Sequence, residues 1–320
     1  MNLADWVRAA GGRTAAIIAR LLGDRSRGAP AILCYHGVLP TPSGISPGAF
    51  HCTPEVFRQQ LAGLKNSGYR FVPLAEMLSM HQEGRFAPRT LAVTFDDGYA
   101  NVLHRAYPVL RELGIPATVF LCTGFVDSKE PLPFDPWCVA HRQRIPVDDY
   151  RHLSEAECFE LVADGRVDLG THTHTHADFR GRPEALREDV TVSCQWLAAR
   201  FGRRPYPFAF PFGRRYTGHS SEELIGAART AGVSCALSTE CGYVSAASSP
   251  YHLGRFLVYA WDSASTLRGK LNGYYAWIPR WQSRLLRNRP AAVKNETLPT
   301  QSAAQSAAGA AGVRRTVRGV

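Results

Sequence analysis

The stretch LAVTFDDG at residues 91–98 is the most informative part of this 320-residue chain. Five uncharged residues, Leu91–Phe95, run directly into two adjacent carboxylates, Asp96 and Asp97, and then a glycine. A short, uninterrupted apolar run bounded by turn residues indicates a β-strand. We therefore expect a strand over Leu91–Phe95, with both aspartates at its carboxyl end.

Similar apolar runs alternate with amphipathic stretches along residues 30–260. Helix starts are indicated by Thr53-Pro54 and by two capping patterns, Ser154-x-x-Glu157 and Ser220-x-x-Glu223. Longer helices are expected at Asn101–Leu113 and Pro183–Phe201. The other predicted strands are Ala31–Cys34, Thr118–Leu121, Val167–Gly170, Phe208–Phe210 and Val233–Leu237. Strands that alternate with helices predict an α/β protein with a parallel sheet or barrel.

Polar or unusual residues follow several of these strands. His36 comes just after the first strand, His172 and His176 follow the fourth, and Pro211-Phe212-Gly213 follows the fifth. Barrels of parallel strands carry their chemistry at the carboxyl ends of the strands. We therefore expect these residues to share one face of the sheet with the two aspartates.

The segment HTHTH at residues 172–176 holds three imidazoles in five positions. His172 and His176 share one face if the segment turns helically, whereas His174 has the intermediate phase and should point away. Two imidazoles and one carboxylate form a three-ligand metal site with an open position. Two adjacent carboxylates also favour a shared cation, although a solvated turn is common before glycine.

Three segments together resemble a known family. TFDDG (94–98), HTHTH (172–176) and FAFPFG (208–213) resemble, in order and spacing, the three motifs of the polysaccharide deacetylase (nodulation-protein-B homology) family. ILCYH (32–36) and LGR (253–255) resemble its bacterial exopolysaccharide branch. The resemblance implies a distorted (β/α) barrel with fewer than eight complete units. It also implies metal-dependent hydrolysis of an N-acyl group, usually N-acetyl, from an amino sugar in a polysaccharide or lipid-linked glycan precursor.

The resemblance assigns roles to individual residues. Asp96 matches the catalytic base, and one divalent ion, usually zinc in this family, would be held by Asp97, His172 and His176. The backbone N–H of Phe212 matches the donor to the reaction's oxyanion. The ion would activate water and polarise the amide carbonyl.

Two positions depart from the pattern of many members. Ala209 stands where an arginine often orients the base, so Arg255 is our candidate replacement, with a structural arginine as the alternative. No late Leu-x-Leu-His motif supplies a general acid. His36 is the first candidate for that role and His252 the second; the alternative for His36 is a supporting hydrogen bond at the barrel mouth.

Substrate contacts and other functions stay open at this point. Pro211 and Trp261 are candidate contacts for a sugar. Trp137 could stack on a sugar ring or, equally well, pack within its own loop. The alternatives to a deacetylase are a deformylase or amidase acting on another N-acyl group, or a glycan-binding module without catalysis. The remaining histidines, which include His51 and His152, are expected at the surface.

The excess positive charge is concentrated in the two terminal segments of the chain. The net charge is +10, but residues 1–29 carry +3 and 268–320 carry +9, which leaves −2 for the predicted catalytic domain at 30–267. We interpret 1–29 as an amphipathic segment and 274–289 as a basic, aromatic segment that either contacts a membrane surface or packs as a terminal helix. The tail after 290 is expected to be disordered. Eight scattered cysteines favour reduced thiols in a cytoplasmic protein, and no specific nucleic-acid partner is expected.

Overall fold

One parallel sheet forms the centre of the computed structural model, which describes residues 28–273. The strands lie in the order β10-β1-β5-β6-β7-β8-β9, with β4 beside β5. Their bounds are β1 (Ala31–Tyr35), β4 (Arg70–Phe71), β5 (Thr90–Phe95), β6 (Ala117–Leu121), β7 (Val167–Thr171), β8 (Phe208–Ala209), β9 (Ala236–Leu237) and β10 (Phe256–Leu257). A separate parallel pair joins β2 (Gly37–Val38) to β3 (His51–Cys52).

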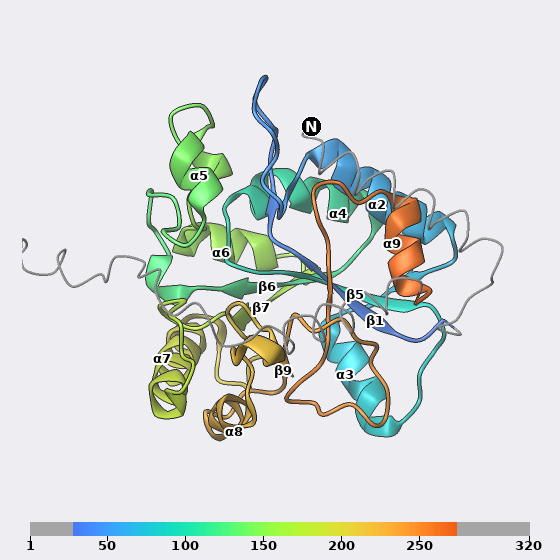
Figure 1. Ribbon diagram of the computed structural model, residues 1–320, viewed down its shortest axis with the longest axis vertical. Coiled ribbons are helices and arrows are strands. Elements are labelled where there is room, and N and C mark those ends of the chain that lie inside the picture. Colours follow the sequence, from blue (N-terminus) through green and yellow to red (C-terminus); the bar gives the residue numbers. More distant parts are fainter. Residues whose placement is uncertain (1–27, 274–320) are drawn as a thin grey trace, which may run out of the picture. The chain divides into compact units, whose positions relative to one another are not determined.

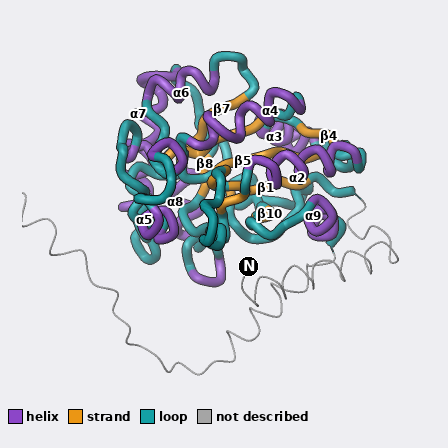
Figure 2. Tube along the Cα trace, turned by 90° about the horizontal axis from the view of Figure 1, so that it is seen from above, coloured by secondary structure: helices purple, strands orange, loops and turns teal. Residues whose placement is uncertain are grey.

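Helices cover both sides of this sheet. The helices are α2 (Pro54–Asn66), α3 (Leu74–Glu83), α4 (Tyr107–Leu113), α5 (Pro136–His141), α6 (Glu155–Val162), α7 (Pro183–Phe201), α8 (Glu222–Thr230) and α9 (Ala264–Leu271). Figure 1 shows α2, α4 and α6 along one side and α3, α7 and α8 along the other. Viewed from above, the strands lie in the middle of the helices (Figure 2). The sheet is curled into a half-barrel, which confirms the predicted distorted (β/α) barrel with fewer than eight complete units.

Alternation along the strands divides the core in two. On β1, Leu33 packs with α2, whereas its neighbour Ile32 faces an inner cluster, because successive side chains of a strand point to opposite faces. Phe120 of β6 and Met77 of α3 belong to the same inner cluster. The inner face of the sheet is therefore filled by apolar side chains, and the polar residues follow at the carboxyl ends of the strands.

Two helix starts differ from the sequence-based expectation. The helix predicted from Asn101 begins with a single wide turn, Val102–Ala106, before α4. The Asn101 side chain does not cap this turn, because its amide instead accepts from Val38 N (2.9 Å) and donates to Asp149 O (2.8 Å). Helix α8 is capped by Ser221, so the predicted cap at Ser220 was one residue early.

The structured domain continues past residue 267, which was expected to be its last. Helix α9 spans this position, and both Leu267 and Leu271 are buried. The helix lies against α2 so closely that a Cβ on Gly63 would come within 2.4 Å of Ala264. The segments 1–27 and 274–320, with the amphipathic, membrane-contact and tail predictions, lie outside the described residues. Within 28–273, no helix is both long and apolar enough to cross a membrane.

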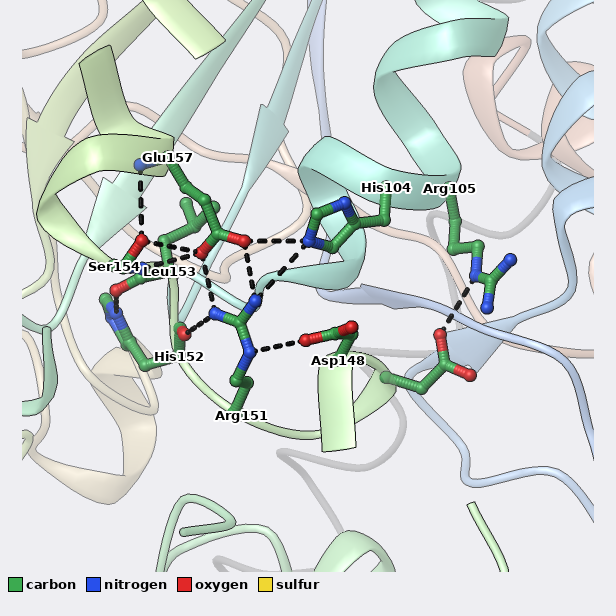
Figure 3. Close-up of polar contacts among 9 residues, drawn as sticks. His104, Arg105, Asp148, Arg151, His152, Leu153, Ser154 and Glu157 are labelled. Atoms are coloured by element: carbon green, nitrogen blue, oxygen red, sulfur yellow. Dashed lines mark hydrogen bonds and ion pairs between the residues drawn. The ribbon is translucent and has the colours of Figure 1, made fainter. Parts of the chain in front are cut away.

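The long connection between β6 and α6 is fixed to the barrel by charged side chains (Figure 3). Arg151 donates two hydrogen bonds to Glu157, both 2.6 Å long, and a third of 2.6 Å to Asp148. Arg105, in the wide turn before α4, donates to the buried Asp149 at 3.0 Å. This connection carries α5 and lies over the strand ends, so its anchoring matters for the site.

Candidate active site

Unusual backbone conformations gather at the carboxyl ends of the strands. Six of the described non-glycine residues have a positive φ, and four of them follow β5, β7 and β8. These four are Asp97 (73°), Thr173 (71°), His176 (54°) and Phe212 (60°). Left-handed φ values cost free energy in residues that carry a Cβ and persist where surrounding contacts enforce them. The fold therefore holds this face in a conformation that local preference alone would not select.

Asp96 and Arg255 form a buried, two-pronged ion pair. The guanidinium places Nη1 2.6 Å from Oδ1 and Nη2 2.7 Å from Oδ2, and both residues are at most 1% exposed. Arg255 also donates from Nε to Ser238 O at 3.0 Å. Burial by itself would raise the pKa of Asp96, but the Arg255 guanidinium outweighs it and holds that pKa well below its usual range. Asp96 is therefore a fixed, ionised carboxylate.

Asp97 faces two imidazoles instead of a cationic side chain. Its Oδ1 lies 3.5 Å from His172 Nε2 and 3.6 Å from His176 Nε2, and all three residues are buried. Tetrahedral zinc with bonds of about 2.0–2.1 Å needs ligand atoms about 3.3 Å apart, which is close to this spacing. Burial, followed by the charge of Asp96, raises the pKa of Asp97 well above its usual value. Among the described residues no lysine or arginine forms an ion pair with Asp97, so these three side chains fit a divalent cation.

The two histidines are held by different contacts. His172 Nδ1 lies 2.8 Å from Ala209 O, which turns Nε2 toward Asp97. His176 Nδ1 is buried and has no hydrogen-bond partner among residues 28–273, and the backbone N–H of this residue donates to Thr173 Oγ1 at 2.9 Å. The segment is not the helical turn we considered; left-handed residues aim both rings at Asp97. Burial lowers the pKa of both imidazoles, so both are in the neutral form that binds metals.

The structure separates the two candidates for the general acid. A ring nitrogen of His36 lies within 4.8 Å of a carboxylate oxygen of Asp96, and His36 Nδ1 has no hydrogen-bond partner in residues 28–273. Removal of the ring from water is the largest of the effects that lower the pKa of His36 to about 4. His252 instead bonds to Ser220 Oγ at 3.1 Å, and none of its described contacts reaches Asp96 or Asp97.

Aromatic side chains form the rim of the site. Phe212 is 47% exposed and lies edge-on to His176, with 5.0 Å between ring centroids. Pro211 is buried, so Phe212 and not Pro211 presents a surface to a ligand. Phe50 contacts the His36 ring, with 4.7 Å between ring centroids, and Tyr259, with 5.6 Å.

Trp261 stacks on Tyr259 with centroids 5.0 Å apart and 4° between the ring planes. Tyr259 in turn contacts Phe50, and Phe50 contacts the His36 ring. These contacts connect Trp261 to the site through Phe50, a residue that the sequence reasoning did not single out.

Sequence reasoning missed a buried cluster beside the site. His51 and His152, expected at the surface, are 5% and 0% exposed. His51 Nε2 lies 2.9 Å from Asp135 Oδ2, which also accepts from Tyr99 at 2.7 Å. A signal existed in the Asp135-Pro136 pair, because an aspartate before proline is typical of a helix start. Nothing local in the sequence shows that His51 would be folded against that aspartate.

These features define a class of protein: a parallel (β/α) half-barrel with an Asp–His–His ligand set and a second, arginine-paired aspartate at its strand ends. Residues 83–236 match the polysaccharide deacetylase family. The chain is also 24% identical over 211 residues to the poly-beta-1,6-N-acetyl-D-glucosamine N-deacetylase of Staphylococcus aureus strain MRSA252. That match covers 63% of this chain and 66% of the relative, so the chain spans just under two thirds of the relative's length.

Solved structures agree with this match. The structure of IcaB from Ammonifex degensii has a TM-score of 0.63 and 26% identity, and the match covers 78% of this chain and 98% of that one. The Streptococcus pyogenes deacetylase PplD, solved with acetate, has a TM-score of 0.62 and 20% identity, covering 76% and 98%. By these comparisons residues 83–236 are similar to the polysaccharide deacetylases, a family of hydrolases that act on amide carbon–nitrogen bonds.

Proposed function

We propose that this protein is a metal-dependent N-deacetylase of an N-acetylated amino-sugar glycan. The observation that carries the proposal is the unequal treatment of two adjacent aspartates. Asp96 is ionised and forms an ion pair with Arg255, whereas Asp97 lies against the neutral rings of His172 and His176. One carboxylate is thereby prepared to accept a proton, and the other to hold a cation.

The ligand set would consist of Asp97, His172 and His176, with zinc as the first ion to test. When bound, such an ion supplies Lewis-acid polarisation of the amide carbonyl and makes water nucleophilic near neutral pH. Two protein ligands are neutral imidazoles and one is a carboxylate, which is a donor set that zinc accepts.

Asp96 accepts the proton of the attacking water in this proposal. Arg255 keeps the carboxylate ionised at neutral pH and fixes the direction of both oxygens. Cys34 Sγ lies 3.4 Å from Oδ2 and adds a weak donor on the same oxygen. A base that is held by two parallel hydrogen bonds cannot rotate away from the water, so its orientation contributes to the rate.

The backbone of Phe212 suits the developing oxyanion. Its N–H makes no hydrogen bond within residues 28–273, and its left-handed φ turns the peptide relative to an extended strand. An unpaired donor in a rigid turn can bind charge that appears only in the transition state.

The leaving amine must finally gain a proton as its bond to the acyl carbon breaks. His36 is uncharged at neutral pH, so it first has to receive the proton that Asp96 takes from water. A ring nitrogen of His36 and a carboxylate oxygen of Asp96 lie within 4.8 Å of each other, which supports His36 as the residue that passes that proton on.

The substrate we propose is a glycan of β-1,6-linked N-acetylglucosamine, because the Staphylococcus aureus relative carries that activity in its name. Exposed Phe50, which contacts His36, and exposed Phe212, which contacts His176, would contact the apolar faces of sugar rings. A cytoplasmic location, a lipid-linked substrate and membrane contact through 274–289 remain predictions from the sequence.

The test is acetate release from β-1,6-linked N-acetylglucosamine oligomers by the purified protein. Chelation should abolish release and one added zinc per chain should restore it. Formylated glucosamine and small N-acetyl amides, assayed in parallel, separate a deformylase or an amidase from a deacetylase. Release that persists after complete removal of metal would contradict the proposal.

A further inference from the structure

In the part of the chain that the structure describes, no residue gives the His176 ring the hydrogen bond that usually orients a metal-binding imidazole. Such rings normally donate their second nitrogen to a carboxylate, carbonyl or water, as His172 does with Ala209. The ring of His176 is instead covered by Phe134, with centroids 3.6 Å apart and 13° between planes. Phe212 touches the same imidazole edge-on at 5.0 Å and 69°. Aromatic contact therefore replaces the hydrogen bond at this ring.

The neighbouring residue of Phe134 is tightly fixed. Asp135 is 8% exposed, and its Oδ1 accepts from the backbone N–H groups of Trp137 (3.0 Å) and Cys138 (3.1 Å). Its Oδ2 accepts from Tyr99 O–H at 2.7 Å and contacts His51 Nε2 at 2.9 Å. Four contacts from three parts of the chain hold this carboxylate, so the backbone on which Phe134 stands cannot shift freely.

The loop that carries Phe134 is also anchored at its far end. Arg151 binds Asp148 and Glu157, and Phe134 itself packs edge-on against Phe125 at 5.7 Å. The Phe134 ring is only partly exposed. Because its loop is anchored on both sides, the Phe134 ring can hold the His176 imidazole in place without a hydrogen bond to that imidazole's Nδ1.

We propose that Phe134 is a positioning residue for His176, and that its ring face favours the ion-bound form of that imidazole. The proposal rests on the metal site of the proposed function. An imidazole that binds a dication becomes electron-poor, whereas the face of a phenyl ring is electron-rich. The face-on contact between Phe134 and His176 is therefore more favourable with the ion than without it, and it adds to metal affinity.

The test measures zinc affinity by competition with a fluorescent chelator at pH 7, using full-length protein. Phe134→Leu keeps an apolar side chain but removes the ring, and we expect about tenfold weaker binding. Phe201→Leu is the matched control: it also removes a half-buried ring from aromatic pairs, with Phe159 and Trp196, and its ring pairs include none of Asp97, His172 and His176. We expect its zinc affinity to stay within about twofold of the wild type.

A second measurement covers the case in which Phe134→Leu disturbs the fold. Fluorinated phenylalanines at position 134 keep the shape of the ring and withdraw electrons from its face. Zinc affinity should fall stepwise as fluorine atoms are added, and the absorption spectrum of the cobalt-substituted protein should change with it. Equal affinity for Phe134→Leu and the wild type, or a flat fluorine series, would overturn the inference. A wild type that binds no zinc would overturn the proposed function as well.

Discussion

Asp96 and Asp97 are adjacent in the chain, yet the fold gives them opposite surroundings. Asp96 points to the inside of the half-barrel, where Arg255 grips both oxygens, and its pKa lies below the usual range. Asp97 turns with a left-handed φ toward His172 and His176, and its pKa is raised by burial and by Asp96. The difference supports our proposal that one dipeptide provides both a charged base and a metal ligand. Arg255 forms an ion pair with Asp96 alone, and Asp97 is left to the two imidazoles.

The largest effect is expected from removing the Arg255 guanidinium, which pairs with Asp96 and not with Asp97. Arg255→Met leaves a buried carboxylate without a partner, which costs about 3–5 kcal/mol in the free energy of unfolding. The pKa of Asp96 should rise, so the loss should be greatest at neutral pH and shrink as the pH falls and Asp96 becomes protonated. Urea unfolding at pH 7 and pH 5 measures this. Arg187→Met, which breaks an exposed pair with Glu184, should cost less than about 1 kcal/mol.

A second substitution tests whether His36, which lies near Asp96, delivers the proton to the leaving amine. His36→Gln should lower kcat about 10²-fold, since it removes the ring that we propose carries the proton from Asp96, and should leave zinc content unchanged. His252→Gln should leave kcat near the wild-type value, because that ring bonds to Ser220 away from both aspartates. Steady-state kinetics on oligomers measures both variants. The reverse order of effects would move the role to His252.

A smaller effect is expected on substrate binding, from the aromatic rim of the site. Phe50→Ala should raise KM for N-acetylglucosamine oligomers by about 2–10-fold, because it removes an exposed ring beside His36. Phe159→Ala removes a ring of similar exposure from α6 and should leave KM unchanged. Identical KM values for the wild type and Phe50→Ala would mean that the sugar does not lie on this side of the site.

The last effect is a pH dependence of stability, and it arises behind Asp97. His152 is fully buried, and a Cβ on Gly98 would come within 2.5 Å of its Nε2. Burial is the main cause that lowers the pKa of His152 to about 4, below the ordinary value of 6.5. The unfolded chain therefore binds a proton between these pH values that the folded chain does not, and stability falls as the pH drops from 6.5 to 4.

Urea unfolding of metal-free protein across that range measures the slope. His152→Asn should give a flatter dependence than the wild type, and His141→Asn serves as the control for the loss of an imidazole elsewhere. An equal slope for the wild type and His152→Asn would show that the buried ring does not contribute.

The sequence predicted the features that depend on neighbouring residues, but it did not predict those that depend on contacts between distant parts of the chain. The strand before Asp96, the helix cap at Thr53 and the capping box at Ser154 are set by nearby residues, and all three were predicted. Short strands such as Gly37–Val38 and His51–Cys52 were missed, because two residues carry no periodic pattern.

The candidate site divides in the same way. Its two aspartates and paired histidines stand in recognisable motifs, so the sequence could name them. The ring contact between Phe134 and His176, by contrast, joins residues 42 positions apart and comes from a loop without periodicity. The separation of His51 from Asp135 is larger still, at 84 positions. Contacts of this kind depend on the tertiary fold, and no local pattern encodes them.

The most direct test of the account is the metal content of two matched variants, Asp96→Asn and Asp97→Asn, purified in parallel and analysed with their acetate release. The account predicts that Asp96→Asn keeps one zinc per chain and loses turnover, whereas Asp97→Asn loses the metal and turnover together. Loss of zinc from Asp96→Asn with retention by Asp97→Asn, or equal retention with full activity in both, would contradict it.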